Sequence, residues 1–223
     1  MEEDSQPDIR GADSADMRRR RTLIFVLSVG RDSKVRPICI EGGHGNMKEK
    51  VNITDYANVI TKALPKGILL NTCADKFNSM VIGWGHLGTL WNKPTFHVYV
   101  RQGRFTKGQL DKAGEFTISV PLENPDPQIN KICGWQSGFD IDKVKEAGLE
   151  LEIAESINTP GVKQYPLTIE CKILYAQDQD LSKIPQDIRE KTYPEDVPGT
   201  YPMANKDFHT MYVGEIVDAY IIR

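Results

Sequence analysis

Apolar and polar residues alternate with a period of two along several short segments of the chain. Between positions 95 and 101, Phe96, Val98 and Val100 alternate with more polar residues, which predicts a strand with one buried face. A short polar turn between 72 and 79 predicts that the flanking runs form a hairpin. Strands are expected over 95–101 and over other runs rich in β-forming residues, which together are 67–72, 79–83, 95–101, 115–120, 149–153, 167–177 and 209–221.

Helical spacing of apolar residues is less frequent. It is clearest between 53 and 64, where Thr54 suits an N-cap and Pro65 would stop the helix. Shorter helices are expected over 106–113, 127–135 and 140–147. A parallel sheet would need a helix between most strands, so the pattern predicts a mainly β fold. We expect a small antiparallel barrel with peripheral helices.

Residues 1–46 do not share this periodicity. A basic run at 17–21 precedes the apolar segment 22–29, which is far shorter than the roughly 20 residues that span a bilayer. No clean cleavage site of a signal peptide follows this segment. We therefore predict a poorly ordered extension over 1–46 and one folded domain over 47–223. Docking of 22–29 on the barrel as an extra strand is the alternative.

Composition excludes several classes of protein. The chain has 223 residues and a net charge of −3, which provides no electrostatic basis for binding nucleic acid. Its four cysteines lie far apart and form no C-x-x-C pair, so we expect neither a zinc site nor a disulfide framework. Idle thiols in a cytoplasmic protein are the simpler interpretation. These cysteines are Cys39, Cys73, Cys133 and Cys171.

The segment 78–94 carries the most specific chemical signal. A short apolar strand leads into a run that contains Gly83, Gly85 and Gly88. Glycines leave the backbone uncovered, so a planar ring can approach its N–H groups closely. A core strand followed by an ordinary glycine turn is the alternative interpretation.

Two arginines follow this segment. Arg101 and Arg104 stand beside Thr106, where a helix is expected to begin. Guanidinium groups and a helix N-terminus are both suited to holding a phosphate, although two solvated surface arginines would show the same spacing. Together with the glycine segment, they indicate a flat aromatic cofactor with a phosphate tail, which describes a flavin.

The same motifs resemble the flavoredoxin branch of the flavin reductase-like family, from about Met47 to the C-terminus. Phe105, Val81 and Phe139 depart from the family pattern, which usually has tyrosine, threonine and often arginine there. The loss of a charge at 139 leaves the role of that loop open. The matching motifs are N-S-M-V-I-G-W-G at 78–85, W-N-K-P at 91–94, V-Y-V-R at 98–101, R-F-T at 104–106, A-L-P-K-G at 63–67, F-T-I-S-V-P at 116–121 and Y-V-G-E-I-V at 212–217.

The resemblance implies an FMN-binding split barrel with Greek-key antiparallel connections, working as a homodimer with FMN at the subunit interface. An exposed loop bearing Trp84, Leu87, Leu90 and Trp91 would supply an apolar patch suited to such an interface. The expected cofactor-binding residues are Ser79, Met80, Val81, Ile82, Gly83, Trp84, Gly85, Arg101, Arg104, Phe105, Thr106 and Ser137.

No residue stands out as a catalytic acid, base or nucleophile, and no metal site is expected. Flavin chemistry takes place on the cofactor, so this pattern suits an oxidoreductase. The chain lacks a G-x-G-x-x-G motif after a strand, so NAD(P)H would bind only transiently over the flavin. Three functions remain open at this point: an NAD(P)H-dependent flavin reductase, a flavoredoxin-like electron carrier and a non-catalytic ligand-binding protein. A redox protein or monooxygenase could accept the electrons, and neither a membrane nor nucleic acid is an expected partner.

Overall fold

A computed structural model of the chain describes residues 47–194 and 207–223. All of these residues belong to one unit of the chain, which lies within Arg36–Arg223. The extension predicted over 1–46 lies outside the described residues, so its state stays a prediction. No helix in the described part is long and apolar enough to cross a membrane.

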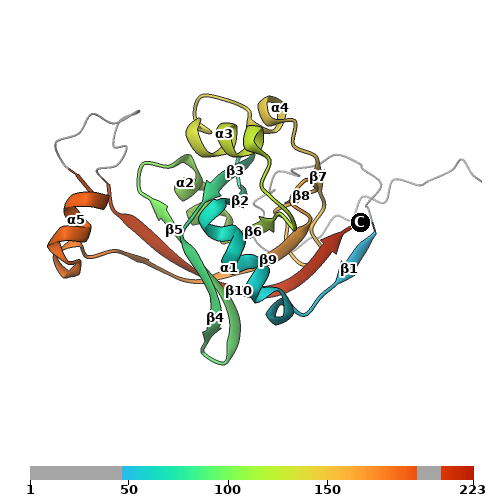
Figure 1. The fold of residues 1–223 in the computed structure, drawn as a ribbon, viewed down its shortest axis with the longest axis horizontal. Helices are drawn as coiled ribbons and strands as arrows, with labels where there is room; N and C mark the ends of the chain where they lie inside the picture. Colours follow the sequence, from blue (N-terminus) through green and yellow to red (C-terminus); the bar gives the residue numbers. More distant parts are fainter. Residues whose placement is uncertain (1–46, 195–206) are drawn as a thin grey trace, which may run out of the picture. The chain divides into compact units, whose positions relative to one another are not determined.

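The domain is built on one large sheet in which every strand pairing is antiparallel (Figure 1). The strand order is β3-β2-β6-β9-β10-β5-β4, and β1 pairs with β10. Several neighbours are distant in sequence, as Greek-key connections require, and the predicted fold class is confirmed. The strands of this sheet are β1 (Lys48–Lys50), β2 (Ile68–Cys73), β3 (Phe77–Ile82), β4 (Gly85–Leu90), β5 (Lys93–Arg101), β6 (Glu115–Val120), β9 (Leu167–Asp178) and β10 (His209–Ile222). A separate small hairpin pairs β7 (Leu151–Glu152) with β8 (Gly161–Val162).

The helices are short and differ from the expected ones mainly at their ends. The first one follows a 3-10 turn at Ile53–Tyr56, which Asn52 caps instead of Thr54 by accepting a hydrogen bond from the Thr54 amide. Helix α4 begins only after its cap Asp142, three residues later than the pattern predicts. The helices are α1 (Ala57–Ala63), α2 (Phe105–Ala113), α3 (Pro127–Trp135), α4 (Lys143–Ala147) and α5 (Gln186–Thr192).

Apolar side chains gather in two groups on the sheet. The larger group includes the predicted buried face of β5, where Phe96, Val98 and Val100 are completely buried. The smaller group lies where α3 and α4 pack on β3, and Figure 1 shows these two helices together at one end of that strand. This second group therefore holds α3 and α4 beside the edge of the sheet.

The glycine-rich segment after β3 is a strand and not the exposed loop that the sequence suggests. Residues Gly85–Leu90 form β4 and pair with β5, and the β4–β5 hairpin extends away from α3 and α4 in Figure 1. A side chain at Gly85 would place its Cβ only 2.7 Å from the carbonyl oxygen of His97, so glycine permits this pairing. Trp91 and Asn92 close the hairpin with positive φ angles of 53° and 58°.

The cysteines do not form a single class. Cys133 and Cys171 are buried free thiols, as expected for idle cysteines. Cys73 is disulfide-bonded, so the prediction of idle thiols is wrong for this residue. The spacing of cysteines along a chain carries no information on which of them the fold brings close together.

Candidate functional site

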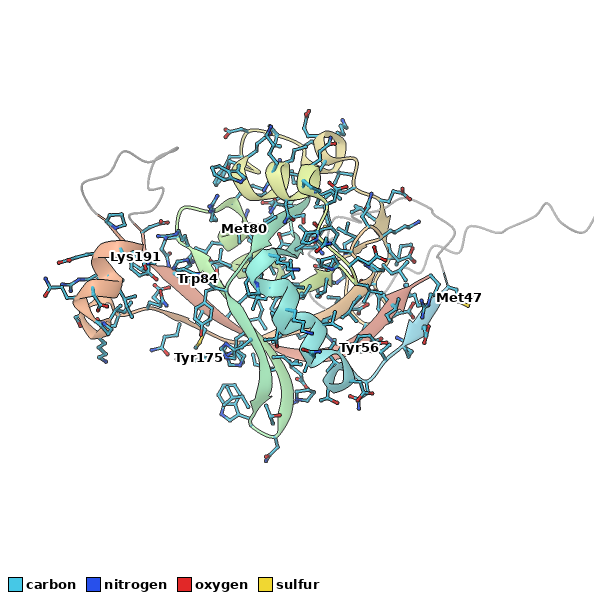
Figure 2. All side chains as sticks on the ribbon, viewed as in Figure 1. Met47, Tyr56, Met80, Trp84, Tyr175 and Lys191 are labelled. Atoms are coloured by element: carbon cyan, nitrogen blue, oxygen red, sulfur yellow. The ribbon has the colours of Figure 1, made fainter. Side chains whose placement is uncertain are left out.

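An open cavity of about 200 Å³ lies where the end of β3 meets the ends of β5 and β10. Seven of the predicted cofactor-binding residues line it, together with Tyr99 and His209, which the sequence analysis did not single out. In the view of Figure 2, Trp84 is drawn between Met80, on the helix side, and Tyr175 of β9. The lining residues are Met80, Val81, Ile82, Gly83, Trp84, Tyr99, Arg101, Arg104 and His209.

The outer edge of β3 forms one wall of this cavity. Strand β3 ends the sheet, so only one of its edges pairs, with β2. The Ser79 carbonyl accepts a hydrogen bond from Lys143 of α4, so the backbone of Ser79 faces the unpaired edge. Backbone groups two residues apart face the same edge of a strand, which places the amide and carbonyl of Val81 there too. A planar ligand in the cavity can therefore bond to the backbone of Val81.

Arg101 lies at the rim of the cavity and is fixed there by hydrogen bonds to the protein backbone. Its guanidinium donates to the carbonyl oxygens of Asp207 (2.7 Å) and Thr192 (2.9 Å) and lies over the ring of Tyr193. These bonds use part of the donor set that the sequence analysis assigned to a phosphate. The Asp207 carboxylate also lies 3.8 Å from the Arg101 guanidinium and offsets part of its charge. Protein contacts thus determine the position of Arg101.

Arg104 occupies the N-cap position of α2, the helix that begins at Phe105. No side chain caps this helix end, and the Arg104 amide donates to the carbonyl oxygen of Arg101 at 3.1 Å. The turn thus brings two guanidinium groups and the positive end of a helix dipole to one side of the cavity. An anionic group is therefore favoured at this end.

His209 contributes an uncharged imidazole to the cavity lining, beside its strand partner Arg101. Burial lowers its pKa to about 3, and the positive charges of Arg101 and Arg104 contribute further. The Tyr193 hydroxyl lies 2.7 Å from Gln179 Oε1 and 2.9 Å from His209 Nδ1. Because the Gln179 oxygen can only accept, the hydroxyl donates to it and accepts from Nδ1–H of His209. This network leaves Nε2 of His209 as the hydrogen-bond acceptor.

Trp84 and Tyr99 provide aromatic surface at the cavity. Trp84 is 47% exposed, and its ring lies 4.7 Å from that of His209. Tyr99 lies two positions before Arg101 on β5, so both side chains project from the face opposite to the buried one. Burial raises the pKa of the Tyr99 hydroxyl, which keeps it protonated as a donor.

Ser79 and Gly85 flank the cavity without lining it. The Ser79 side chain is buried and donates to Asn71 Oδ1 at 2.8 Å, inside the sheet. Gly85 begins β4 and pairs with Val98. Both residues shape the wall through the backbone, and their predicted contacts with a cofactor stay predictions.

Phe105, Thr106 and Ser137 lie beyond Arg104, around the start of α2. The Thr106 hydroxyl is buried and accepts a hydrogen bond from Asn78 Nδ2 at 2.9 Å. The ring of Phe105 packs edge-on against Phe139, in the loop that Ser137 opens. A Cβ at Gly138 would lie 2.6 Å from Phe105, so this loop packs tightly on the helix start. The fold therefore brings the three residues close to the positively charged end of the site, but they do not line the cavity.

The two lining residues that sequence reasoning missed differ in kind. Tyr99 could have been found, because the period of two on β5 places it on the same face as Arg101. His209 carried no such signal. It meets the cavity only because it pairs with Arg101 in the β5–β10 ladder, across more than a hundred positions of sequence.

Two further histidines lie on the β4–β5 hairpin. The rings of His86 and His97 are 4.2 Å apart, and burial and the neighbouring His86 lower the pKa of His97. His97 also lies 3.2 Å from the Thr95 hydroxyl. Neither histidine lines the cavity, which agrees with ordinary strand positions for both.

The residues that line this cavity lie within a match to a known protein family. A family model described as the flavin reductase like domain matches residues 61–223. The chain belongs to the flavin reductase-like family. The match spans well over half of the chain and includes every element that lines the cavity. No curated protein sequence matches the chain.

Several solved structures share the fold of this flavin reductase-like domain. An FMN-binding domain of a flavin reductase-like enzyme from Shewanella baltica has a TM-score of 0.53 and 18% identity, covering 81% of this chain and 80% of its own. The flavoredoxin of Desulfovibrio vulgaris (Miyazaki F) has a TM-score of 0.51 and 21% identity, covering 70% and 68%. An NADH:FAD oxidoreductase from Streptomyces globisporus has a TM-score of 0.50 and 14% identity, covering 70% and 74%. At these identities the likeness concerns the fold.

Proposed function

We propose that this protein binds FMN and acts as an oxidoreductase of the flavin reductase type. The observation that carries the proposal is the cavity itself, where the outer edge of β3 meets two arginines and the neutral His209. A flavin mononucleotide has a planar ring with carbonyl and N–H groups along one edge and a phosphate at the end of its chain. The cavity offers a complementary feature for each of these parts.

The residues present fit FMN in two respects. The Val81 backbone on the unpaired edge of β3 can exchange hydrogen bonds with the ring, and Arg104 at the N-terminus of α2 can hold the phosphate. Trp84 offers an exposed aromatic surface beside the cavity. When bound, FMN would supply the hydride and electron transfer, while the protein supplies position and electrostatics.

His209 and Tyr99 would orient the ligand and complete its hydrogen bonds. The neutral imidazole of His209 stays an acceptor at working pH because its pKa is about 3, well below 7. The Tyr99 hydroxyl stays protonated and can donate. Neither residue changes its charge during turnover near neutral pH, so both suit the binding of a ring whose own charge changes.

The physiological reaction has two forms within this proposal. In the first, NAD(P)H binds transiently over the flavin and reduces it, and the enzyme is a flavin reductase. In the second, FMN stays bound and passes electrons between proteins, as in a flavoredoxin-like carrier. A non-catalytic FMN-binding protein is the remaining alternative. We favour the enzyme because Trp84 leaves an aromatic surface open beside the cavity, where a nicotinamide could stack.

We also propose a homodimer with FMN at the subunit interface. One chain encloses only about 200 Å³ here, below the roughly 300–1,000 Å³ of ligand pockets. Exposed apolar side chains surround the β4–β5 hairpin and the adjoining part of β9, and Trp91 packs edge-on against Tyr175. A second copy that covers this surface would also complete the cavity. A cytoplasmic location is part of the same proposal.

An absorption spectrum of the purified protein tests the proposed function. We expect visible flavin bands after FMN is added and excess is removed, and bleaching of these bands by NADH or NADPH without oxygen. Catalytic consumption of NAD(P)H with free FMN would identify a reductase, whereas bleaching of bound FMN by a protein donor alone would identify a carrier. A protein that retains no flavin at micromolar concentration would contradict the proposal.

A further inference from the structure

Lys143 is buried at the outer edge of β3, next to the stretch that lines the cavity. It is the first residue of α4 and only 4% exposed. Its ammonium group donates to the carbonyl oxygens of Ser79 on β3 and Cys133 on α3, at 2.9 Å each. The side chain thus connects the outer edge of β3 with the last turn of α3.

Within residues 47–194 and 207–223, no carboxylate forms an ion pair with Lys143. Both of its hydrogen-bond partners in the described residues are uncharged carbonyl groups. The neighbouring Asp142 accepts instead from the amides of Val144 and Lys145, as the cap of its own helix. Burial lowers the pKa of Lys143 to about 8, the thiol of Cys133 acts in the opposite direction, and Arg104 and Lys76 lower it further. An ammonium group held among like charges is unfavourable, and a purely structural link would not need one.

The position of Lys143 relative to the cavity is set by the strand. Ser79 immediately precedes Met80–Trp84, the stretch of chain that lines the cavity. The Val81 backbone lies two residues further along the same edge, at roughly 7 Å from the carbonyl that Lys143 binds. A flavin ring bonded to that edge would interact electrostatically with the Lys143 ammonium group, because the protein interior between them has a low dielectric constant.

We propose that Lys143 supplies a buried positive charge that favours the reduced, anionic state of a flavin held along the edge of β3. This inference rests on the FMN binding proposed above. Reduction adds negative charge to the ring system. A fixed positive charge beside the same strand edge stabilises that reduced ring more than the neutral oxidised ring. Lys143 is accordingly a positioning residue that acts through the electrostatics of the wall.

The alternative is that Lys143 only ties two carbonyl groups together. Lys143→Gln separates these roles, because an amide retains N–H donors for the carbonyls but carries no charge. Lys143→Arg retains the charge. Lys145→Gln on the same helix is the matched control, because its side chain is 83% exposed.

The measured quantity is the ratio of the dissociation constants of oxidised and reduced FMN, obtained by anaerobic titration. We expect Lys143→Gln to lower the preference for reduced FMN about tenfold at pH 7. Lys143→Arg should retain most of the preference, and Lys145→Gln should equal wild type. Thermal unfolding of each variant without FMN measures any structural contribution separately.

The wild-type protein provides a second test that needs no variant. Lys143 loses its proton as pH rises through about 8, so the preference for reduced FMN should fall between pH 7 and 9.5. The groups that face it are Cys133 from α3, Lys76 from the β2–β3 turn and Arg104 from the start of α2. Among these, the thiol of Cys133 has a pKa raised by burial, and its titration is controlled by a Cys133→Ser variant.

The outcomes are distinguishable from those of the proposed function. Equal FMN ratios in wild type and Lys143→Gln would overturn the inference while leaving FMN binding intact. A ratio that stays constant from pH 7 to 9.5 would overturn it as well, even if Lys143→Gln does not fold. Failure of the wild-type protein to bind FMN would overturn both the inference and the proposed function.

Discussion

The two arginines that the sequence pairs have different surroundings at the scale of single residues. Arg101 is held by the carbonyl oxygens of Asp207 and Thr192, so much of its binding capacity serves the protein. Arg104 stands at the uncapped start of α2 and lines the same cavity. The spacing of three residues predicted that both arginines bind a phosphate. In the structure, Arg101 bonds to the protein backbone, and Arg104 lines the cavity at the start of α2.

We predict that Arg104→Ala weakens FMN binding by about one to two orders of magnitude. A charge-assisted hydrogen bond contributes roughly 1.5–3 kcal/mol, and the phosphate would lose at least one. Riboflavin lacks the phosphate and should bind to wild type and Arg104→Ala almost equally. Titration of both flavins by fluorescence quenching measures this. Equal losses for both would show that Arg104 supports the fold or the ring. Lys107→Ala serves as the control, because Lys107 lies on the same helix but does not line the cavity.

His209 should make the folded state sensitive to acid. Its pKa is about 3 in the folded protein, against about 6.5 in an unfolded chain. Between these values the unfolded chain binds a proton that the folded one does not. The free energy of unfolding therefore falls as pH drops below about 6.5, by up to about 1.4 kcal/mol per pH unit, and this contribution is fully present above pH 7.

Chemical denaturation at pH 7 and pH 5 measures this effect. The loss of stability between the two pH values should be smaller in His209→Gln than in wild type, because glutamine does not titrate. The exposed His86, changed to glutamine, is the control and should retain the wild-type difference. An identical pH dependence in His209→Gln and wild type would contradict the assignment of a neutral, buried imidazole.

At the scale of elements, the β4–β5 hairpin shows how glycines were misinterpreted. They suggested a loop, yet Gly85 and Gly88 lie in a strand whose pairing with β5 depends on a small residue at Gly85. The turn of this hairpin places Trp91 in the left-handed region, at φ 53°, which costs a residue with a side chain about 1–2 kcal/mol. A large aromatic side chain kept in that conformation, 58% exposed, suggests a contact beyond the chain itself.

We predict that Trp91→Gly preserves the fold and weakens the proposed dimer. Glycine adopts a positive φ without strain, so the melting temperature of the isolated chain should not fall. Loss of a large aromatic anchor from an interface should raise the dimer dissociation constant by tenfold or more. Sedimentation over a dilution series measures this constant. Leu122→Ser, at a similarly exposed leucine away from the hairpin, should have no effect, and a Trp91→Gly protein that dimerises like wild type would contradict the prediction.

At the scale of the whole molecule, strand β1 joins the N-terminal side of the described domain to its C-terminal strand. Met47 precedes β1, and β1 pairs with the C-terminal end of β10. The family match covers residues 61–223, within the predicted domain. Neither observation tests the boundary at 46/47, which stays a prediction.

We predict that a shortened chain of residues 47–223 folds and binds FMN with an affinity within threefold of the full chain. The reason is that the elements lining the cavity all lie after Met47. Both chains should be compared with a thiol reductant present, which keeps Cys73 reduced in each of them. FMN titration and light scattering measure affinity and mass. A shortened chain that is insoluble or colourless would show that residues 1–46 are structural.

Local patterns in the sequence determined most of the elements of this protein and the wall of its site. Alternation of apolar residues predicted β5, because burial of one face of a strand requires it locally. The motif at 78–85 predicted the stretch that lines the cavity. Only the tertiary structure decided that His209 reaches the site, that Arg101 is held by Asp207, and that Lys143 binds the carbonyl of Ser79. These contacts join residues 64 to 108 positions apart. Pairing of distant strands and helices creates them, and no periodicity or short motif records such pairing.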